Sequence, residues 1–334
     1  MNEPVRVGVV GAGALGFHHV RILRDFPGVA FAGFHDAKAE RSAQVSAELG
    51  VRGFESAQQL IDSCDALTIV VPTPAHHSVA KLALQQGRHL LIEKPLTATL
   101  EEADELLEIA ARSGALVQTG HVERFNRAIR AALPYVDRPR FIESDRLAPF
   151  SPRGADVAVV LDLMIHDIDL ILTLIRDTVD EVSAVGIPVL TPFVDIANAR
   201  ITFRSGAVAN ITASRVSRER MRKLRIFQQS GYLSLDLASG DGEFYRMRND
   251  LDLAALAKSP LQIEAFVERI PFSAPEGEPL RLEFESFVAA LQGRAPVSVS
   301  GRDGRDALAV ALRIQREIER TLPSVAGAGG VVRA

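Results

Sequence analysis

The sequence predicts an α/β protein with an N-terminal Rossmann domain, built on a doubly wound parallel sheet, and a C-terminal α+β domain with a mostly antiparallel sheet. Three observations predict this fold. Short apolar runs alternate with helical stretches through residues 5–119, as they do in parallel α/β sheets. A Gly-x-Gly-x-x-Gly motif follows the first apolar run. Beyond residue 180, strand patterns follow one another without helices between them, which is typical of antiparallel sheets.

Length and composition limit the class of protein. The 334 residues are enough for two average domains, and 47% hydrophobic with 24% charged residues is ordinary for a globular enzyme. The formal net charge of −4 and the lack of a Lys/Arg run predict no nucleic-acid and no membrane partner. No apolar stretch approaches the ~20 residues of a membrane span, and we find no signal peptide. Cys64, the one cysteine, cannot form an internal disulfide, so we expect a buried, inert thiol and a cytoplasmic location.

The elements of the first domain follow from the spacing of its apolar residues. Continuous apolar runs indicate buried strands, and apolar residues every three or four positions indicate helices. Thr99 and Glu102 have the spacing of a capping box and open a helix that ends at Ser113. Strands are expected at Val5–Val10, Val29–Phe34, Val51–Phe54, Ala66–Val71, His89–Ile92 and Ala115–Thr119, and further helices at Leu15–Phe26, Ala39–Leu49, Ser56–Ser63 and His76–Gln86.

The second domain begins after a boundary that we place near Val122. Ser205-Gly206 and Gly240-Asp241-Gly242 indicate turns between strands. Helices are expected at Asn126–Leu133, Val159–Ile175, Leu280–Leu291 and Arg302–Leu322, and extended segments at Arg140–Arg146, Val182–Leu190, Ala197–Phe203, Val208–Val216, Leu224–Gln229 and Tyr232–Leu237. The predicted domains are therefore residues 1–122 and 123–323, followed by a flexible Gly/Ala-rich tail at 324–334.

The glycine motif predicts a dinucleotide site. Gly11 allows a tight turn, Gly13 lets the backbone approach a pyrophosphate, and Gly16 lets the helix pack closely on the strand. The free N–H groups at the start of that helix then face the phosphates. The predicted cofactor contacts are Gly11, Gly13, Ala14, Leu15, Gly16, Asp36, Arg41, Thr73, His76, Glu93 and Lys94.

Asp36 predicts which dinucleotide is bound. It ends the second strand, about 20 residues after the motif, where a carboxylate accepts hydrogen bonds from the ribose hydroxyls of NAD. Lys38 and Arg41 follow closely, so NADP remains open. The alternative interpretation of Asp36 is a residue that only starts the next helix.

Two further segments carry groups for proton transfer. Glu93-Lys94-Pro95 follows a strand whose carboxyl end lines the ligand crevice in a doubly wound sheet, although a surface ion pair is an equal interpretation. Asp162 and His166 lie four residues apart on an otherwise apolar helix, with Asp169 on the same side. Because buried charges are costly, this spacing predicts a catalytic cleft. No zinc motif and no nucleophile elbow is found, so we expect no metal.

Together these residues resemble the Gfo/Idh/MocA oxidoreductases. The likeness rests on Gly11–Gly16, Glu93-Lys94-Pro95, Asp162-x-x-x-His166 and the closing segment Glu278–Ala307. It implies that Lys94 contacts the reacting hydroxyl and the nicotinamide, that His166 is the acid/base, and that Asp162 positions it. It also implies a large, open-faced second-domain sheet that forms a homodimer or homotetramer.

A narrower likeness is to the branch that oxidises C3 of UDP-N-acetylglucosamine in lipid A or surface-sugar biosynthesis. It rests on Gly120–Asn126, which resembles a GHxERFNP motif, on Ala213–Arg215 and on Met221–Lys223. The likeness predicts an NAD-linked oxidation of a UDP-N-acetylhexosamine, with Lys94 or His166 removing the proton. The predicted substrate residues are Lys94, Arg124, Asn126, Asp162 and His166, with Arg153 and Arg215 as further cations for the diphosphate.

Two alternatives remain open. The first keeps the chemistry but acts on a free sugar or polyol, as an inositol dehydrogenase does. The second is a non-catalytic NAD-sensing protein. The joint presence of Lys94, Asp162 and His166 argues against the second alternative.

Overall fold

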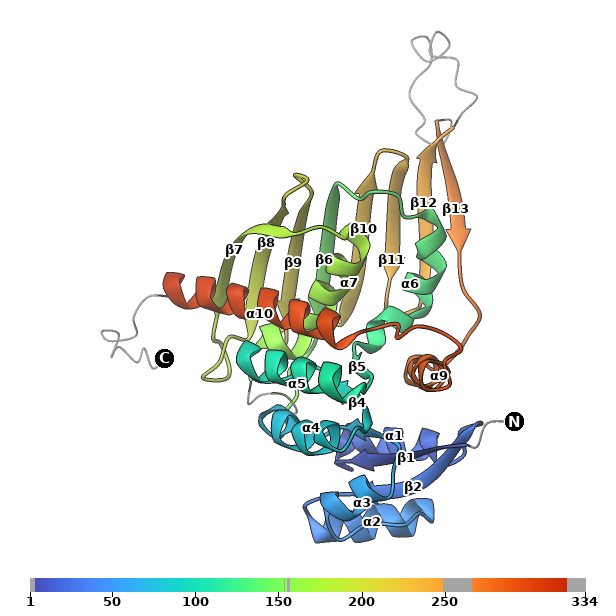
Figure 1. Ribbon diagram of the computed structural model, residues 1–334. Helices are drawn as coiled ribbons and strands as arrows, with labels where there is room; N and C mark the ends of the chain where they lie inside the picture. The colour runs from blue at the N-terminus through green and yellow to red at the C-terminus, as the bar shows by residue number, and fades with distance from the viewer. Residues whose placement is uncertain (1–3, 153, 155–156, 249–265, 323–334) are drawn as a thin grey trace, which may run out of the picture. The chain divides into compact units, whose positions relative to one another are not determined.

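The computed structural model describes residues 4–152, 154, 157–248 and 266–322 (Figure 1). Their contacts divide into two compact units. The first unit contains the described residues up to Pro134 together with Phe272–Ala309, and the second contains those from Tyr135 to Pro271 and from Val310 onward. The boundary therefore lies later than the position near Val122 that we expected, and a C-terminal stretch returns to the first unit. The expected tail lies outside the described residues.

The first unit is built on a five-stranded sheet in the order β2-β1-β3-β4-β5. All neighbouring strands are parallel, and the direction of winding changes at β1, which confirms the predicted doubly wound sheet. The strands are β1 (Val5–Val10), β2 (Val29–His35), β3 (Ala66–Ile69), β4 (His89–Glu93) and β5 (Val117–Gly120).

The predicted strand at Val51–Phe54 is wrong. Only Gly53 pairs with the sheet, in an isolated bridge to Phe34. Two backbone hydrogen bonds hold this segment, and Ser56 then caps the next helix at once by accepting the N–H of Gln59, so no longer ladder forms.

The helices of the first unit start and end where local chemistry dictates. The predicted capping box is confirmed, because Thr99 Oγ1 accepts the N–H of Glu102 while the Glu102 carboxylate accepts the N–H of Thr99, each at 3.2 Å. Gly50 and Gly114 end their helices in the left-handed conformation. The helices are α1 (Ala14–Leu23), α2 (Ala39–Leu49), α3 (Ala57–Asp62), α4 (His76–Gln85), α5 (Leu100–Ser113) and α6 (Arg127–Ala132).

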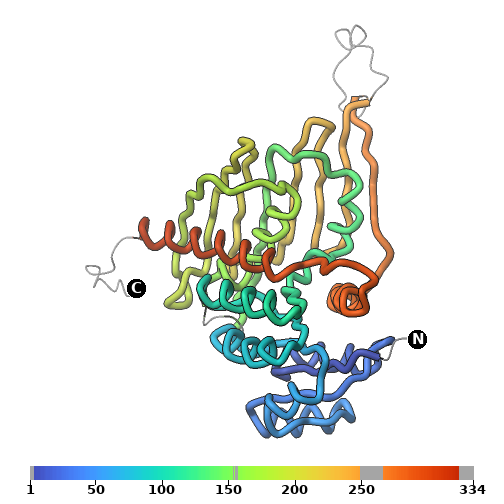
Figure 2. Tube along the Cα trace, viewed as in Figure 1, coloured from blue at the N-terminus to red at the C-terminus, as the bar shows by residue number. Residues whose placement is uncertain are grey.

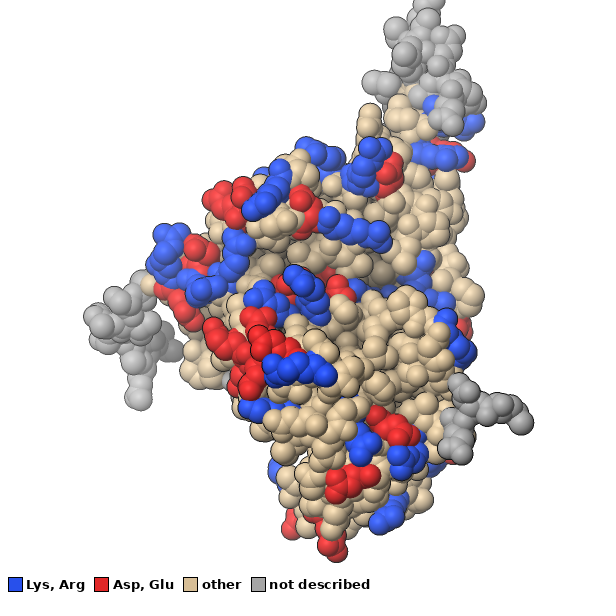
Figure 3. Space-filling model, in the orientation of Figure 1, with Lys and Arg blue, Asp and Glu red and all other residues tan. Residues whose placement is uncertain are grey.

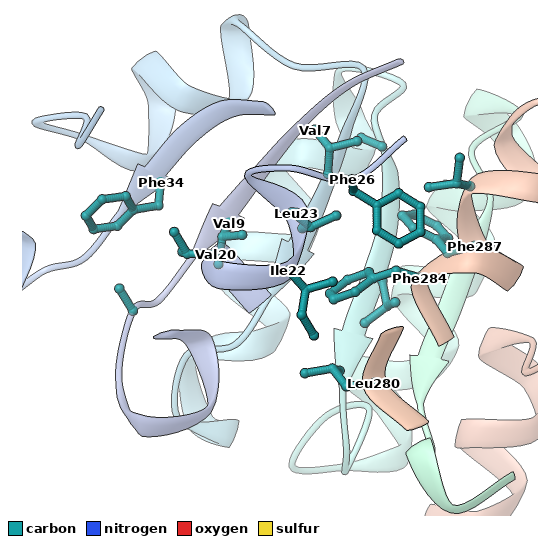
Figure 4. Close-up of a cluster of buried hydrophobic side chains, with 14 of the residues drawn as sticks. Val7, Val9, Val20, Ile22, Leu23, Phe26, Phe34, Leu280, Phe284 and Phe287 are labelled. Carbon is teal, nitrogen blue, oxygen red and sulfur yellow. The ribbon is translucent and has the colours of Figure 1, made fainter. Parts of the chain in front are cut away.

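The core of the first unit continues into helix α9 (Pro279–Leu291). Phe284 and Phe287 of this helix are fully buried beside Phe26, which follows α1 (Figure 4). The Phe26 and Phe284 ring centroids lie 6.3 Å apart in an edge-to-face arrangement. This apolar contact explains why a segment so late in the sequence belongs to the first unit.

The second unit is built on an eight-stranded sheet in the order β13-β12-β11-β10-β6-β9-β8-β7, which Figure 2 shows as a row. Only the β6–β9 pair is parallel among the pairings described, so the sheet is mostly antiparallel as predicted. Gly206, with a φ of 79°, makes the predicted turn between β8 and β9. The strands are β6 (Phe141–Leu147), β7 (Val179–Ile187), β8 (Ile196–Phe203), β9 (Val208–Ser214), β10 (Met221–Gln228), β11 (Gly231–Asp236), β12 (Asp241–Met247) and β13 (Val267–Phe272).

The first strand after the apolar helix ends earlier than predicted, at Ile187 and not at Leu190. The reason is Asp195, whose buried carboxylate accepts the backbone N–H groups of residues 189–191 at 2.6–2.9 Å. These N–H groups are therefore turned away from the sheet.

Helices cover one face of the second sheet. A π-helical turn, η4 (Val160–Met164), leads into α7 (Ile165–Ile175), and together they form the apolar helix that we predicted. Helix α10 (Gly301–Thr321) begins in the first unit and continues into the second, where Ile318 packs against Gly186 of β7.

Charges are mixed on the face drawn in Figure 3, where acidic and basic side chains alternate. This pattern agrees with the small net charge of −4. Among the described residues, no helix is long and apolar enough to cross a membrane.

We expect Phe284→Ala to lower the free energy of unfolding by about 3–5 kcal/mol, because it removes a fully buried ring from the first unit's core. Phe193→Ala is the matched control, since that ring is 42% exposed and its loss should cost less than about 0.5 kcal/mol. Thermal and urea unfolding measure both changes. Equal losses in the two variants would contradict the placement of α9 in this core.

Candidate cofactor and catalytic site

The three glycines of the motif are required for different reasons. Gly11 has a φ of 94°, and a Cβ there would lie 2.6 Å from the carbonyl oxygen of Val70. A Cβ on Gly16 would overlap the carbonyl oxygen of Gly11. By contrast, a Cβ on Gly13 would meet no protein atom within 4 Å. Packing within the protein thus explains Gly11 and Gly16, whereas Gly13 keeps open a space that fits the approach of a pyrophosphate.

The start of helix α1 suits a phosphate group. Gly13 is its N-cap residue, and no side chain caps the helix. The first N–H groups, which belong to Ala14, Leu15 and Gly16, lie at the positive end of the helix dipole. The predicted contacts of this segment therefore occupy one anion-binding position at the carboxyl end of β1.

Asp36 and Arg41 both hold the glycine loop. The Asp36 carboxylate accepts the N–H of Ala12 at 2.7 Å and that of Lys38 at 2.9 Å. The Arg41 guanidinium donates to the carbonyl oxygen of Ala12 at 2.7 Å and lies over the Phe17 ring. A carboxylate at this place fits the two ribose hydroxyls of NAD and repels the 2′-phosphate of NADP.

The loop after β3 lies against the glycine loop. Gly11 approaches the backbone of residues 70–71, and Thr73 then begins the 3-10 turn η1 (Thr73–Ala75). The half-buried Thr73 therefore lies at the same edge of the sheet as the motif. His76, also a predicted cofactor contact, is 1% exposed, and its two ring nitrogens lie against backbone carbonyl oxygens. Its ring is enclosed by protein.

Glu93 is likewise directed into the protein. Its buried carboxylate accepts a hydrogen bond from His19 Nε2 at 3.1 Å, so it is not the surface ion pair that we considered. Burial alone raises the pKa of Glu93, but the hydrogen bond and charge of His19 outweigh burial and lower the pKa below its usual value. Lys94 follows at the end of β4, half-buried, at the same edge as Asp36 and Thr73.

The predicted substrate residues Arg124 and Asn126 have partners inside the first unit. The Arg124 guanidinium lies 3.5 Å from the Asp303 carboxylate and donates to the carbonyl oxygen of Ser298. The Asn126 side chain caps α6 by accepting the N–H of Ala128 at 3.0 Å.

Asp162 and His166 lie in the second unit, both half-buried. Asp162 is part of the π-helical turn, a rare geometry that is frequent at functional sites, and His166 is in the first turn of α7. The predicted companion Asp169 is buried, so it does not share their exposure. The neighbouring Asp167 forms a buried, two-pronged ion pair with Arg146, at 2.7 and 3.0 Å.

The remaining cations of the prediction are Arg215 and Arg153. Arg215 is buried and donates to the Asp195 carboxylate at 2.7 Å and to the carbonyl oxygen of Gly154. Hydrogen bonds from backbone N–H groups and from Arg215 overcome the effect of burial and hold the pKa of Asp195 well below its usual value. Arg153 lies outside the described residues.

Two expectations concerned cysteine and metals. Cys64 is buried as expected, and burial raises the pKa of its thiol to about 12, which disfavours the reactive thiolate. In the part of the chain that the structure describes, no three His, Cys, Asp or Glu side chains are grouped to hold a metal ion.

Sequence reasoning missed His19. This residue lies on α1, one turn after Gly16, and its partners come from β3 and β4. The available signal was its position, since a histidine three residues beyond the motif falls on the face of α1 that meets the sheet.

Comparison with protein-family models identifies both parts of the chain. Residues 5–121 match the oxidoreductase family with an NAD-binding Rossmann fold, and residues 135–234 match the GFO/IDH/MocA C-terminal domain.

Two curated relatives are similar in sequence. The chain is 38% identical over 319 residues to the UDP-N-acetylglucosamine 3-dehydrogenase of Acidithiobacillus ferrooxidans, which covers 95% of this chain and 98% of that protein. It is 30% identical over 236 residues to the scyllo-inositol 2-dehydrogenase of Bacillus subtilis, which covers 65% and 69%.

Solved structures give the same result for the fold. The crystal structure of the Acidithiobacillus ferrooxidans enzyme matches with a TM-score of 0.86 over 95% of this chain and 98% of that one. The WlbA dehydrogenase from Bordetella pertussis, in complex with NADH and UDP-GlcNAcA, matches with a TM-score of 0.76 over 95% and 97%. Its 18% identity supports the shared fold alone.

Substitutions in the glycine loop should change the free energy of unfolding and the affinity for NAD independently of each other. We expect Gly13→Ala to change the free energy of unfolding by less than about 0.5 kcal/mol, because the new Cβ meets no protein atom. The same methyl group should raise the Kd for NAD about tenfold or more, because it occupies the space that a pyrophosphate needs.

Gly16→Ala is the matched variant for this prediction. Its Cβ overlaps a backbone oxygen, so it should lower the free energy of unfolding by about 1–3 kcal/mol. Thermal unfolding and NAD titration of both variants measure the difference. An unchanged Kd in a stable Gly13→Ala protein would contradict the assignment of this space to the cofactor.

Proposed function

Because this chain belongs to the GFO/IDH/MocA family of NAD-binding oxidoreductases, we propose that it oxidises a secondary alcohol of a nucleotide sugar, at C3 of a UDP-N-acetylhexosamine. The observation that carries the proposal is the 38% identity to a UDP-N-acetylglucosamine 3-dehydrogenase across 98% of its length. The glycine loop, the uncapped start of α1 and Asp36 support NAD as the cofactor.

In this proposal Lys94 acts on the reacting hydroxyl. It lies at the carboxyl end of β4, at the edge where the glycine loop and Asp36 fit NAD. Its ammonium holds the hydroxyl oxygen and stabilises the negative charge that develops there as the proton leaves. When bound, NAD would supply the acceptor for the hydride that leaves the carbon bearing this hydroxyl.

The base of the reaction is His166, or Lys94 if it starts as a neutral amine and becomes the ammonium by taking the proton. An imidazole is the side chain best suited to accept a proton near neutral pH, and His166 is half-buried in an apolar helix. Asp162 orients that ring. The oxidation turns the C3 hydroxyl into a ketone and releases one proton.

The similarity to a scyllo-inositol dehydrogenase supports a second candidate, the oxidation of a free polyol. The chemistry would be the same, but the substrate would carry no diphosphate. We favour the nucleotide sugar because the inositol dehydrogenase shares 30% identity over only 65% of this chain.

The first experiment mixes enzyme, NAD and UDP-N-acetylglucosamine in single-turnover amounts and follows NADH absorbance. We expect a burst of NADH that approaches one equivalent of enzyme. Lys94→Ala and His166→Ala should each slow the burst about 10²-fold or more, because each removes a group that acts in the transition state, while the Kd for NAD stays within about threefold.

Lys81→Ala is the control, because Lys81 forms an exposed ion pair with Glu105 and should be dispensable. Wild-type rates in both Lys94→Ala and His166→Ala would overturn the mechanism. A burst of NADH with scyllo-inositol and none with UDP-N-acetylglucosamine would establish the oxidation of a free polyol instead.

We also propose that the chain is cytoplasmic and forms a homodimer or homotetramer through the outward face of the eight-stranded sheet. Val185 and Ile187 of β7 are 57% and 59% exposed on this face. A row of stacked aromatic rings crosses four neighbouring strands of the same face, formed by Phe141, Phe227, Tyr232 and Tyr245. Exposed apolar and aromatic side chains of this kind are typical of a subunit interface.

Light scattering after size-exclusion chromatography tests the oligomer. We expect the wild type to be a dimer or tetramer, and Val185→Glu with Ile187→Glu to shift it toward smaller species, because two charges would be buried at the contact. Leu82→Glu is the control, since Leu82 is an exposed apolar residue of α4 in the other unit. A monomeric wild type would contradict the proposal.

A further inference from the structure

We propose that two buried histidines, His19 and His76, are positioning residues for the segment Glu93–Pro95, which we call the Lys94 turn. They fix this segment from its two sides. His19 acts on the residue before Lys94, and His76 acts on the residue after it. The inference rests on the proposed role of Lys94, and it adds two residues that are buried in the protein.

His19 holds Glu93. Its side chain is completely buried on α1, with Nε2 3.1 Å from Glu93 Oε1 and Nδ1 3.3 Å from Thr68 Oγ1. Its ring packs edge-on against Phe284, with centroids 5.1 Å apart. Because the Thr68 hydroxyl can either donate or accept, the ring can present an N–H to Glu93 and still be satisfied at its other nitrogen.

The Glu93 carboxylate has no room to move. Its second oxygen accepts the backbone N–H of Lys94 at 3.3 Å, so the carboxylate spans from His19 to the lysine's own backbone. A Cβ on Gly120 would lie 2.9 Å from both carboxylate oxygens. The position of Glu93, and with it the start of the Lys94 turn, is therefore set by His19 on one side and by the backbone of β5 on the other.

His76 holds the other end of the turn. It is 1% exposed, with Nδ1 3.0 Å from the carbonyl oxygen of Pro95 and Nε2 2.8 Å from that of Val71. Burial lowers the pKa of His76 against the opposing effect of these two carbonyl groups. The neutral ring has one N–H and donates to one of the two oxygens at a time. The contact to Pro95 is the one that bears on Lys94.

These contacts join the lysine to the loops that fit the cofactor. Helix α1, which carries His19, starts at the glycine loop, and helix α4, which carries His76, starts at the turn that begins with Thr73. Each imidazole thus connects a cofactor loop to one end of the Lys94 turn. A core histidine needs only some polar neighbour, whereas these two contact the residues on both sides of one lysine.

The two histidines contact the Lys94 turn through different ring nitrogens, so the same pair of substitutions should have opposite effects at the two positions. A Gln amide can replace Nε2 of a histidine, and an Asn amide can replace Nδ1. At position 19 the contact that matters is made by Nε2, so His19→Gln should keep the rate and His19→Asn should lose it. At position 76 the contact is made by Nδ1, so His76→Asn should keep the rate and His76→Gln should lose it.

The rate measured is hydride transfer in a single turnover with NAD and UDP-N-acetylglucosamine, using the full chain. We expect His19→Asn and His76→Gln to be about tenfold to hundredfold slower, since small misplacements of a reacting group have effects of that size. The other two variants should stay within about twofold, and the Kd for NAD within about threefold in all four. His77→Gln is the control, because His77 pairs with Glu105 near the surface.

Two further measurements separate this inference from the proposed function. If the histidines act through Lys94, adding His76→Gln to Lys94→Ala should cause no further loss of rate. Reductive ¹³C-methylation and NMR then report on Lys94 without turnover, with its signal assigned by Lys94→Arg. We expect that signal to shift in His19→Asn and His76→Gln, and to stay in His19→Gln and His76→Asn.

The outcomes are distinct. If Lys94→Ala keeps the wild-type rate, or UDP-N-acetylglucosamine gives no burst, the proposed function fails and the NMR shifts alone decide the positioning role. If Lys94→Ala is inactive but all four histidine variants keep the wild-type rate and the wild-type Lys94 signal, the positioning role is overturned. Equal losses in the Gln and Asn variants at both positions, with lower unfolding temperatures, would also overturn it in favour of a general packing role.

Discussion

The contact between Gly16 and the carbonyl oxygen of Gly11 is the constraint on which the first unit depends. With no side chain at Gly16, helix α1 starts directly against the end of β1. That one approach leaves the N–H groups of α1 facing the space beside Gly13 and sets the direction of the whole helix. One turn later the same helix presents His19 to Glu93, and at its end the chain places Phe26 against α9. The placement of α1 therefore determines the glycine loop, the position of Glu93 before Lys94 and the packing of Phe26 on α9.

Buried, paired carboxylates recur beside the candidate catalytic residues in both units. The hydrogen bond between His19 and Glu93 precedes Lys94, and the Asp167–Arg146 ion pair follows His166 by one position. Burying such groups is costly, and well-packed apolar residues can be equally stable in their place. Their use here agrees with a need for fixed geometry, because a paired carboxylate accepts hydrogen bonds in only a few directions, whereas an apolar side chain can shift.

Local rules explain which parts of this structure could be predicted. The parallel sheet, the tight turn at Gly11 and the Thr99 capping box depend on residues close together in sequence, and these predictions are confirmed. The partners of buried polar groups lie far apart in sequence, so sequence reasoning assigned Arg215 to a substrate when its partner is Asp195, and it overlooked His19. Strands β12 and β13 were not predicted either, because their half-exposed, charged residues lack a clear apolar alternation.

The return of α9 to the first unit has a consequence for how the chain folds. During synthesis, Phe26 and its apolar neighbours leave the ribosome long before Phe284 and Phe287, the residues that cover them. The Rossmann unit therefore cannot complete its core as an independent N-terminal piece, and it waits with an open apolar surface while the second unit is made. Contacts of such wide sequence separation slow folding. Maturation of the cofactor-binding unit is thereby tied to completion of nearly the whole polypeptide.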